Sequence, residues 1–358
     1  MLTWSRYDLL LDQAWSPTPL NTSSYFRNWT TNRYSTGPAS VSSIPSNLYA
    51  AWESLRTTVY NNTNLTSNAV PKGIYELQPN ITGLLNRTGH HPTTLNYNPA
   101  VVTTAWRSFY NASLSNPALY DNPAFAYDFV DITRQVIANA FMGSYSNFTA
   151  TYAATVNATV INATTPSNAT VQRIQAAGQP LLNLLSSLDE ILATNPSFLL
   201  STWIDDSLTW TNSTAIFPPL STSSVIMAAN STNPIPNYTT ENTTGPAVAA
   251  YYEYSARNQL TLWGPTGQIS DYASKSWAGL VSTYYLPRWQ MFINYCASTP
   301  YARYNYTALG AQTLAFEESW QTQTWGTVLG QTSGTTGTLA EVLGGVVRNY
   351  TGSGLFGM

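Results

Sequence analysis

The apolar residues of this chain recur mostly with the period of an α-helix. One stripe, spaced by three and four residues, consists of Leu181, Leu184, Leu185, Leu188 and Leu192. Such spacing places side chains on one helical face, where they can pack into a core. Comparable stripes run through the segments 47–60, 100–112 and 125–141. No segment alternates like a half-buried strand, so we expect an all-α fold, an irregular multi-helix bundle with long loops and no substantial sheet.

Polar residues and prolines support this helical interpretation. Asp131 and Arg134 lie three residues apart, where they can form an ion pair on one helical face. Asn-Pro pairs at 122–123 and 195–196 mark turns before the next elements. Pro287 interrupts an apolar stretch, so we expect a helix to kink or restart there.

Three segments are expected to be loops or links rather than core helices. Residues 148–170 and 209–245 are rich in Thr and Asn, and they are typical of exposed loop insertions. Residues 330–358 are predicted to form a flexible link followed by a short terminal helix. By length alone, one large helical domain or two smaller ones would fit. We interpret residues 1–358 as a single helical domain.

Charged residues are scarce, which narrows the classes of partner. They make up 9 % of the chain, against about 25 % in ordinary globular proteins, and the formal net charge is −3. No basic stripe is present, so nucleic-acid binding is not expected. The chain has neither a positive field toward an acidic surface nor an apolar run long enough to span a bilayer, so no membrane partner is expected.

Asn-x-Ser/Thr sequons are more frequent than chance predicts for this composition. They begin at Asn21, Asn28, Asn61, Asn64, Asn80, Asn86, Asn111, Asn147, Asn157, Asn162, Asn168, Asn212, Asn230, Asn237, Asn242, Asn305 and Asn349. The excess indicates a heavily glycosylated secreted protein, with glycosylated loops and with sugar replacing charge as the solubilising group. An Asn- and Thr-rich composition with unused sequons is the alternative.

The compartment is only indirectly indicated. Cys296 is the single cysteine, so no disulfide can form within the chain. Segment 1–17 has no long apolar region and is not a signal peptide. A glycoprotein without a leader suggests that these residues follow a longer N-terminal part. We therefore expect a secreted or vacuolar, lysosome-like location, with the leader outside this chain.

Candidate catalytic groups are few. His90 and His91 are adjacent, with no Cys, Asp or Glu nearby, so a solvated loop is favoured over a metal site. Adjacent acids occur at Asp189–Glu190, Asp205–Asp206 and Glu317–Glu318. Neighbours on a helix point about a third of a turn apart, so none of these pairs can flank one substrate bond. No phosphate-binding glycine loop is found, and we expect no cofactor.

The strongest local feature is the aromatic segment 260–292, "LTLWGPTGQISDYASKSWAGLVSTYYLPRWQMF". Gly264 and Gly267 permit a tight turn beside Trp263, and we expect a helix to follow. Asp271 would lie at the start of that helix, where its carboxylate could cap free amides. A Trp ring suits the flat C–H face of a sugar, with Tyr hydroxyls at the rim. Core packing and the wall of a sugar-binding pocket are therefore both open interpretations.

Several segments together carry a family resemblance. The regions Arg257–Trp289, Phe125–Phe141, Leu184–Ile204 and Tyr7–Trp15 resemble the C-terminal part of α-N-acetylglucosaminidases, glycoside hydrolase family 89. The segments occur in the same order as in that family. The likeness covers most of the chain and is weakest in the two predicted loops and near the C-terminus.

The resemblance implies the helical domain of a three-part retaining exo-glycosidase of fungal type. In that family two Glu on a (β/α)8 barrel are catalytic, and no segment of this chain resembles the motifs that carry them. The chain alone should thus contain no catalytic residue and be inactive. Its expected partners are the catalytic barrel of the same enzyme and the terminal α-N-acetylglucosamine of a glycan. The resemblance assigns substrate-binding roles to Trp263, Ile269 and Tyr272, the latter two on one face of the expected helix start.

Other functions remain open from the sequence. The chain could stand alone as a secreted non-catalytic glycoprotein or carbohydrate-binding module derived from the enzyme. It could also be a structural surface protein shielded by glycans. An apolar face left uncovered without the barrel would favour self-association, so a homo-oligomer is a further expected partner.

Overall fold

The computed structural model describes residues 4–35, 44–61, 71–89, 91–155, 165–209, 246–264, 266–323 and 337–357. Its α-helices are α1 Trp4–Ala14, α2 Thr22–Tyr34, α3 Ser46–Thr57, α4 Pro99–Ser115, α5 Pro123–Ala153, α6 Asn168–Leu192, α7 Leu200–Leu208, α9 Pro246–Leu260, α10 Leu286–Ser298, α11 Tyr306–Gln321 and α13 Leu339–Asn349. Within these ranges no strand forms, and only an isolated parallel bridge joins Leu199 to Ala278. The predicted all-α fold is confirmed.

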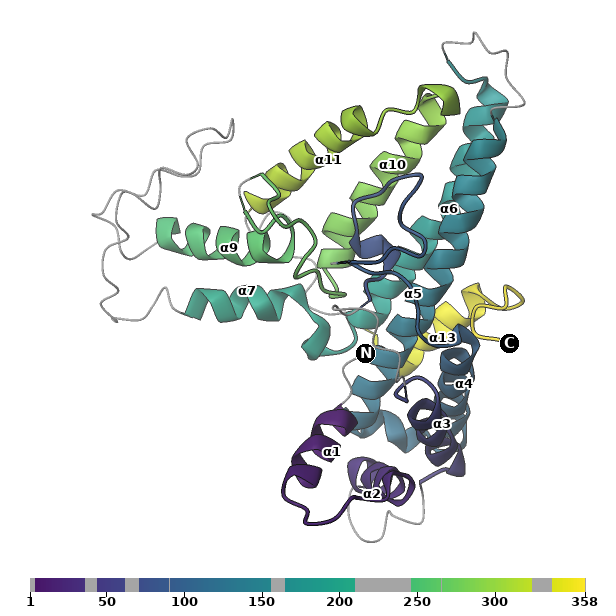
Figure 1. Ribbon diagram of the computed structural model, residues 1–358, viewed down its shortest axis with the longest axis vertical. Coiled ribbons are helices and arrows are strands. Elements are labelled where there is room, and N and C mark those ends of the chain that lie inside the picture. Colours follow the sequence, from purple (N-terminus) through teal and green to yellow (C-terminus); the bar gives the residue numbers. More distant parts are fainter. Residues whose placement is uncertain are drawn as a thin grey trace.

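Helices α5 and α6 form the long spine of the molecule and pack against each other (Figure 1). The predicted leucine stripe of α6 is buried along its length, from Leu181 to Leu192. On α5, Arg134 and Asp131 form the predicted ion pair at 2.6 Å. Asn122 begins α5 by accepting hydrogen bonds from the backbone of Ala124 and Phe125, as the Asn-Pro signal indicated. Regular helix periodicity thus builds the core directly.

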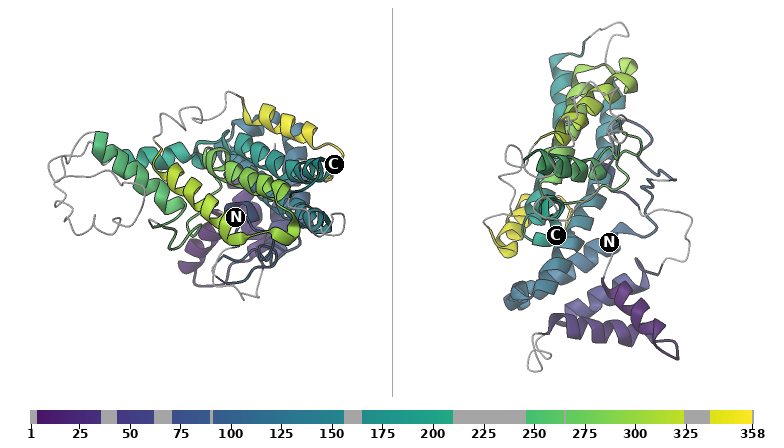
Figure 2. Two further views of the ribbon diagram at one scale, coloured as in Figure 1. Left: turned by 90° about the horizontal axis from the view of Figure 1, so that it is seen from above. Right: turned by 90° about the vertical axis from the view of Figure 1, so that its left-hand side faces the viewer.

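The other helices surround this spine in three groups and one single helix, α13. Helices α1, α2, α3 and α4 gather at one end, while α10 and α11 lie beside the spine toward the other end (Figure 1). Helices α7 and α9 pack together as an arm that projects to one side, which Figure 2 shows from two further directions. Helix α13 packs on α6 near the C-terminus. The segment between α9 and α10 therefore lies where the arm meets the spine.

Several sequence expectations need correction at their edges. Helix α5 continues to Ala153 and α6 begins at Asn168, so both ends of the predicted loop 148–170 are helical. Residues 156–164 of that segment, and nearly all of 209–245, lie outside the described residues. A helix occupies Leu339–Asn349 in the C-terminal region. No described helix combines the length and apolar character that crossing a bilayer requires.

Candidate functional site

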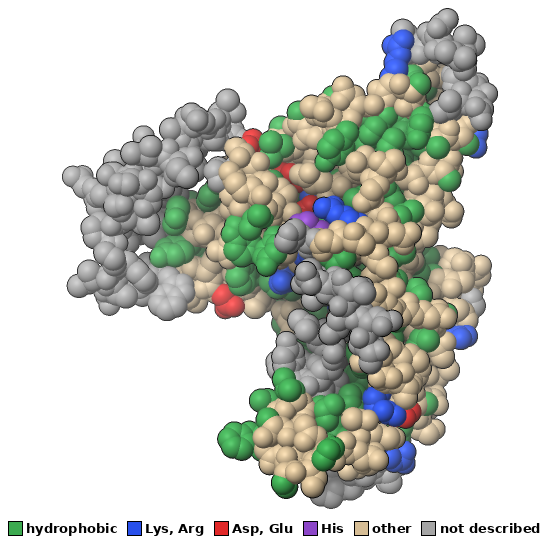
Figure 3. Space-filling model, viewed as in Figure 1, with side chains coloured by type: hydrophobic (Ala, Val, Ile, Leu, Met, Phe, Trp, Pro, Cys, Tyr) green, Lys and Arg blue, Asp and Glu red, His purple; other side chains and the backbone are tan. Residues whose placement is uncertain are grey.

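The three predicted sugar-facing side chains all reach the surface. The exposed fractions are 40 % for Trp263, 44 % for Ile269 and 53 % for Tyr272. The rings of Trp263 and Tyr272 meet edge to face, with centroids 5.6 Å apart. Tyr272 also donates its backbone N–H to the Ile269 carbonyl at 3.1 Å, so the two lie in one turn. Figure 3 shows hydrophobic side chains gathered on this face, over the segment that follows α9. This exposure disfavours the core-packing interpretation.

The helix predicted directly after the glycine turn does not form there. Residues 266–273 form turns and residues 274–277 have no regular secondary structure; the π-helical turn Val281–Tyr285 then leads into α10. Asp271 has a left-handed φ of 61°, and its N–H donates to the Thr261 carbonyl at 2.7 Å. A left-handed residue interrupts a right-handed helix. Ile269 and Tyr272 therefore share a turn, and Asp271 is not a helix cap.

Asn258, near the end of α9, fixes the conformation of the aromatic turn. Its side-chain Oδ1 accepts from the Gly264 N–H at 2.8 Å, and its Nδ2 donates to the Gly264 carbonyl at 2.9 Å. Its own carbonyl accepts from the Trp263 N–H at 2.7 Å. Trp263 has a left-handed φ of 42°, which is costly for a bulky residue. These three bonds hold the indole in a conformation that the chain would not adopt alone.

A buried polar network lies beneath the turn and is centred on Arg288 of α10. Its Nη1 contacts Asp271 Oδ1 at 2.9 Å and Glu317 Oε1, on α11, at 2.8 Å. Its Nη2 donates to the Glu76 carbonyl at 2.8 Å. Gln78 closes the network, since its N–H donates to Asp271 Oδ2 and its Nε2 to Glu317 Oε2. Segments far apart in sequence are thus joined through one guanidinium.

Burial and neighbouring charges together shift the pKa values of this network. Burial opposes the charge of Arg288, but Asp271 and Glu317 outweigh it, so its pKa lies well above the usual value. Burial raises the pKa of Glu317, against the attraction of Arg288, which lowers it. Two carboxyl groups therefore share one cation in the interior, and the network depends strongly on that cation.

Asp271 and Glu317 are the acids that the fold brings closest to the aromatic turn, but they cannot serve as a hydrolytic pair. Their side chains are 3 % and 0 % exposed, so no substrate can reach them. Gln78 and Arg288 also occupy both oxygens of each carboxyl group. Retaining hydrolysis needs one carboxyl free to protonate the leaving group and another free to attack. The network is suited to stabilising the aromatic turn rather than to catalysis.

Two residues of an earlier segment border the turn, and the sequence did not indicate them. Lys72 donates from Nζ to the Tyr272 carbonyl at 2.9 Å and to Ser274 Oγ at 2.8 Å, and burial lowers its pKa. His91 is half-buried, with its ring centroid 6.3 Å from that of Tyr272. His91 lies in a bend and is only partly exposed to solvent, while His90 lies outside the described residues.

The remaining candidates play structural parts. Asp189 accepts from the N–H groups of Gly279 and Ser282 at 2.8 and 3.0 Å, so it caps the helix start that leads into α10. Asp205 and Asp206 are exposed on α7. Across the described part of the chain, no group of three His, Cys, Asp or Glu side chains could hold a metal ion.

Most predicted glycosylation positions that can be described are accessible. Exposed side chains occur at Asn21, Asn28, Asn61, Asn86, Asn111, Asn147, Asn168, Asn305 and Asn349. Asn80 is half-buried, and its Oδ1 accepts from the Tyr304 hydroxyl at 3.0 Å. Outside the described residues lie Asn64, Asn157, Asn162, Asn212, Asn230, Asn237 and Asn242. Exposure leaves room for a glycan, and attachment stays a prediction.

The supporting residues could have been suspected from charge scarcity. In a chain with so few charged residues, Arg288 stands within the apolar run "YYLPRWQMF", and Glu317 follows Phe316. A charge in an apolar setting is usually paired. The sequence does not say with which partner, because Gln78, Asp271 and Glu317 come from separate segments.

Comparisons with known proteins agree with the fold. A model of the alpha-N-acetylglucosaminidase C-terminal domain matches residues 25–344. Human alpha-N-acetylglucosaminidase is 27 % identical over 288 residues, which cover 80 % of this chain and 30 % of that protein.

Solved structures give the same picture. A Clostridium perfringens family 89 glycoside hydrolase, in complex with its substrate GlcNAc-alpha-1,4-galactose, has a TM-score of 0.71 at 19 % identity, covering 99 % of this chain and 34 % of that one. Its complex with PUGNAc gives 0.70 at 19 % identity, covering 98 % and 33 %. This chain thus spans about a third of the length of these relatives. Since the family model matches most of it, the chain belongs to the family of alpha-N-acetylglucosaminidase C-terminal domains.

Proposed function

We propose that this chain is the C-terminal helical part of a retaining exo-α-N-acetylglucosaminidase. In this role it forms one wall of the pocket for the terminal N-acetylglucosamine and packs on a catalytic barrel that lies outside this chain. The observation that carries the proposal is the exposed edge-to-face pair of Trp263 and Tyr272. Two large rings left open to solvent on a rigid base are typical of a binding surface.

The chemistry of the turn suits a sugar. The indole of Trp263 offers an apolar face for sugar C–H groups, and Tyr272 offers a hydroxyl at the rim. Ile269 adds an apolar contact in the same turn. The relative from Clostridium perfringens is described with GlcNAc-alpha-1,4-galactose, a sugar of this class. This wall orients the sugar ring and excludes water, which helps hold the glycosidic bond in register with the acids of the barrel.

The proposal assigns no acid or nucleophile to this chain. The carboxyl groups nearest the turn are buried and bonded, so the acid/base and the nucleophile belong to the barrel. The isolated chain is then inactive, and a single wall covers too little of a ligand to bind it tightly. Secretion or delivery to a vacuolar, lysosome-like compartment, with glycans on the exposed sequons, belongs to the same proposal.

A pair of chains tests this division of labour. The 358-residue chain and the same chain joined to its N-terminal barrel are assayed on an aryl α-N-acetylglucosaminide. We expect activity only with the barrel present. Hydrolysis by the short chain would refute the proposal, and tight binding of N-acetylglucosamine by that chain in calorimetry would replace it with a stand-alone carbohydrate-binding module.

A tryptophan pair tests the pocket wall. In the barrel-containing enzyme, Trp263→Ala should raise KM at least tenfold, because the sugar loses its stacking partner. The matched control is Trp15→Ala, since Trp15 is 89 % exposed and lies on the segment after α1, away from the aromatic turn. Equal KM values for the two variants would remove Trp263 from the sugar site.

A further inference from the structure

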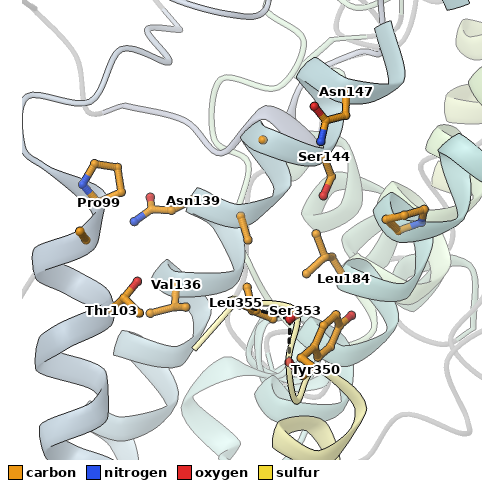
Figure 4. A pocket seen from close by; sticks show the side chains of 15 residues that line it. Pro99, Thr103, Val136, Asn139, Ser144, Asn147, Leu184, Tyr350, Ser353 and Leu355 are labelled. Carbon is orange, nitrogen blue, oxygen red and sulfur yellow. Dashed lines mark hydrogen bonds between the residues drawn. The ribbon is translucent and has the colours of Figure 1, made fainter. Parts of the chain in front are cut away.

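A hollow lies along the spine helices α5 and α6, and none of the residues of the aromatic turn lines it. Its volume is about 460 Å³, within the range of ligand sites. It is formed between α4, α5, α6 and the C-terminal turns (Figure 4). Thr103, Asn139, Ser144, Leu184 and Tyr350 contribute to its walls. The face of α5 that lines it differs from the face that carries Phe141 and Tyr145, whose rings contact Trp289 below the aromatic turn.

A predicted glycosylation position lies in the wall of this hollow. Asn147 begins the sequon Asn147-Phe148-Thr149 and is exposed on α5. Side chains on a helix tilt toward its N-terminus, so Asn147 extends over Gly143 and Ser144. Figure 4 shows the amide nitrogen of Asn147 on the side that faces Ser144. Nothing lies within 4 Å of the position that a Cβ at Gly143 would take. The hollow is therefore open beside Gly143, in the direction in which a sugar attached to Asn147 would extend.

The lining has the mixed chemistry that a sugar ring needs. Leu184 and the ring of Tyr350 face each other and provide apolar surface for sugar C–H groups (Figure 4). Asn139 provides a donor, because its Nδ2 is buried and has no hydrogen-bond partner in the described structure. Its Oδ1 is already used, accepting from the Tyr97 hydroxyl at 3.2 Å and Gln135 Nε2 at 3.1 Å. This nitrogen is shielded from solvent, so a sugar hydroxyl or acetamido oxygen would satisfy the donor after a rotation of the Asn139 side chain.

We infer that this hollow holds the first N-acetylglucosamine of an N-linked glycan on Asn147, which fixes the C-terminal turns to α5. The inference rests on the glycosylation that accompanies the proposed function. In the transfer, Asn147 Nδ2 loses a proton and bonds to C1 of the sugar, while the diphosphate of an oligosaccharide–diphosphate donor leaves. The proximal sugar then lies between α5 and Tyr350, and the rest of the glycan extends into solvent.

The first test separates the proximal sugar from the rest of the glycan. The full chain is secreted from a eukaryotic host, and occupancy of each sequon is measured by peptide mass spectrometry. An endoglycosidase leaves one N-acetylglucosamine per site, while an amidase hydrolyses the side-chain amide, so that the whole glycan leaves as a glycosylamine and each glycosylated Asn becomes Asp. We expect Asn147 to be occupied, the single-sugar form to keep the Tm of the intact protein, and the amidase-treated form to melt on the order of 2 °C lower.

Variants of single sequons show which site causes the difference in Tm between the single-sugar and amidase-treated forms. Asn147→Gln should lower the Tm of the single-sugar form on the order of 2 °C. The matched control is Asn111→Gln, an exposed sequon within α4 whose side chain does not line the hollow, and its Tm should not change. Equal shifts for the two variants, or an unoccupied Asn147 beside an occupied Asn111, would overturn the inference.

A filling variant tests the hollow without touching the sequon. Gly143→Leu replaces a helix-interior glycine, so without sugar it should raise the Tm through better helix propensity. In the single-sugar form the leucine competes with N-acetylglucosamine for the hollow, so the increase in Tm should be lost or become a decrease. The same gain in both forms would show that the sugar lies elsewhere. Because none of these measurements uses glycosidase activity, the proposed function and this inference can fail independently.

Discussion

Two aromatic regions of this chain look alike in sequence and differ completely in the fold. Trp106 of α4 is fully buried, with its ring stacked on Phe356 and its Nε1 donating to Thr133 Oγ1 at 2.8 Å. Trp263, in the turn after α9, is 40 % exposed and meets only the edge of Tyr272 among the ring contacts of the described residues. One ring supports the fold and the other faces outward.

The backbone beneath each ring explains the difference. Helix α4 is regular, so its periodicity turns Trp106 toward α5 and into the core. Trp263 has a left-handed backbone conformation held by Asn258, and the interior beneath its turn is occupied by the Arg288 network. The rings of Tyr284 and Tyr285 are buried against Arg288, with ring centroids 4.7 and 5.5 Å from its guanidinium, so the space beneath the turn is already filled. Exposure of a tryptophan is thus decided by what already fills the space below it.

The largest expected effect comes from removing the polar base. Arg288→Met leaves Asp271 and Glu317 buried without their cation and should lower the free energy of unfolding by about 3–5 kcal/mol. Without the cation, the pKa of Glu317 rises further above its value in the unfolded chain, so the folded variant takes up protons as the pH falls. The loss in free energy of unfolding caused by Arg288→Met should therefore become smaller between pH 7 and pH 5. Urea unfolding at both pH values measures this.

The control for that variant is Arg173→Met, which removes an exposed arginine of α6. Its free energy of unfolding should change by less than about 0.5 kcal/mol and show no extra pH dependence. A deficit of Arg288→Met as small as this would mean that the network does not support the turn.

Removing the buried ring should have a similar but pH-independent effect. Trp106→Ala leaves a large cavity between α4 and α5 and should lower the free energy of unfolding by about 3–5 kcal/mol. Chemical unfolding followed by circular dichroism measures the loss. A cost below about 1 kcal/mol would contradict the core role of Trp106.

Loosening the aromatic turn should cost less stability and more function. Asn258→Ala removes both side-chain bonds to Gly264, and we expect a loss of about 1–2 kcal/mol. Asn258→Asp keeps the acceptor for the Gly264 N–H but places a carboxylate oxygen against the Gly264 carbonyl and Gln321 Oε1, so its cost should not be smaller. In the barrel-containing enzyme, Asn258→Ala should raise KM by a larger factor than it lowers kcat. The quenching of tryptophan fluorescence by acrylamide should also differ from that of the unchanged enzyme. An unchanged KM for Asn258→Ala would separate this clamp from the sugar site.

The smallest stability effect is expected at the exposed ring itself. Trp263→Ala removes a side chain that is 40 % exposed and should lower the free energy of unfolding by about 1 kcal/mol, although it weakens sugar binding. The same unfolding measurement applied to Trp106→Ala completes the comparison. Equal losses in free energy of unfolding for Trp263→Ala and Trp106→Ala would show that the exposure of the ring does not determine its contribution to stability.

Much of the fold follows from local spacing. The stripe from Leu181 to Leu192 predicted a buried helical face, and the pairing of Asp131 with Arg134 needed only a three-residue separation. Both depend on residues within one or two turns of each other, and helix geometry fixes such relations without knowledge of the rest of the chain. The sequence by itself therefore determined the all-α class and indicated α3, α4, α5, α6 and α13, whereas it did not indicate α2, α9 or α11.

The candidate site was decided only by the tertiary structure. The sequence drew attention to Trp263 and Tyr272, but it predicted a helix where Asp271 takes a left-handed conformation. It also gave no sign that Arg288 would meet Glu317, because contact between segments far apart in sequence depends on how whole helices pack. Local periodicity carries no information about such pairings, and the free energy that holds a strained turn comes from them.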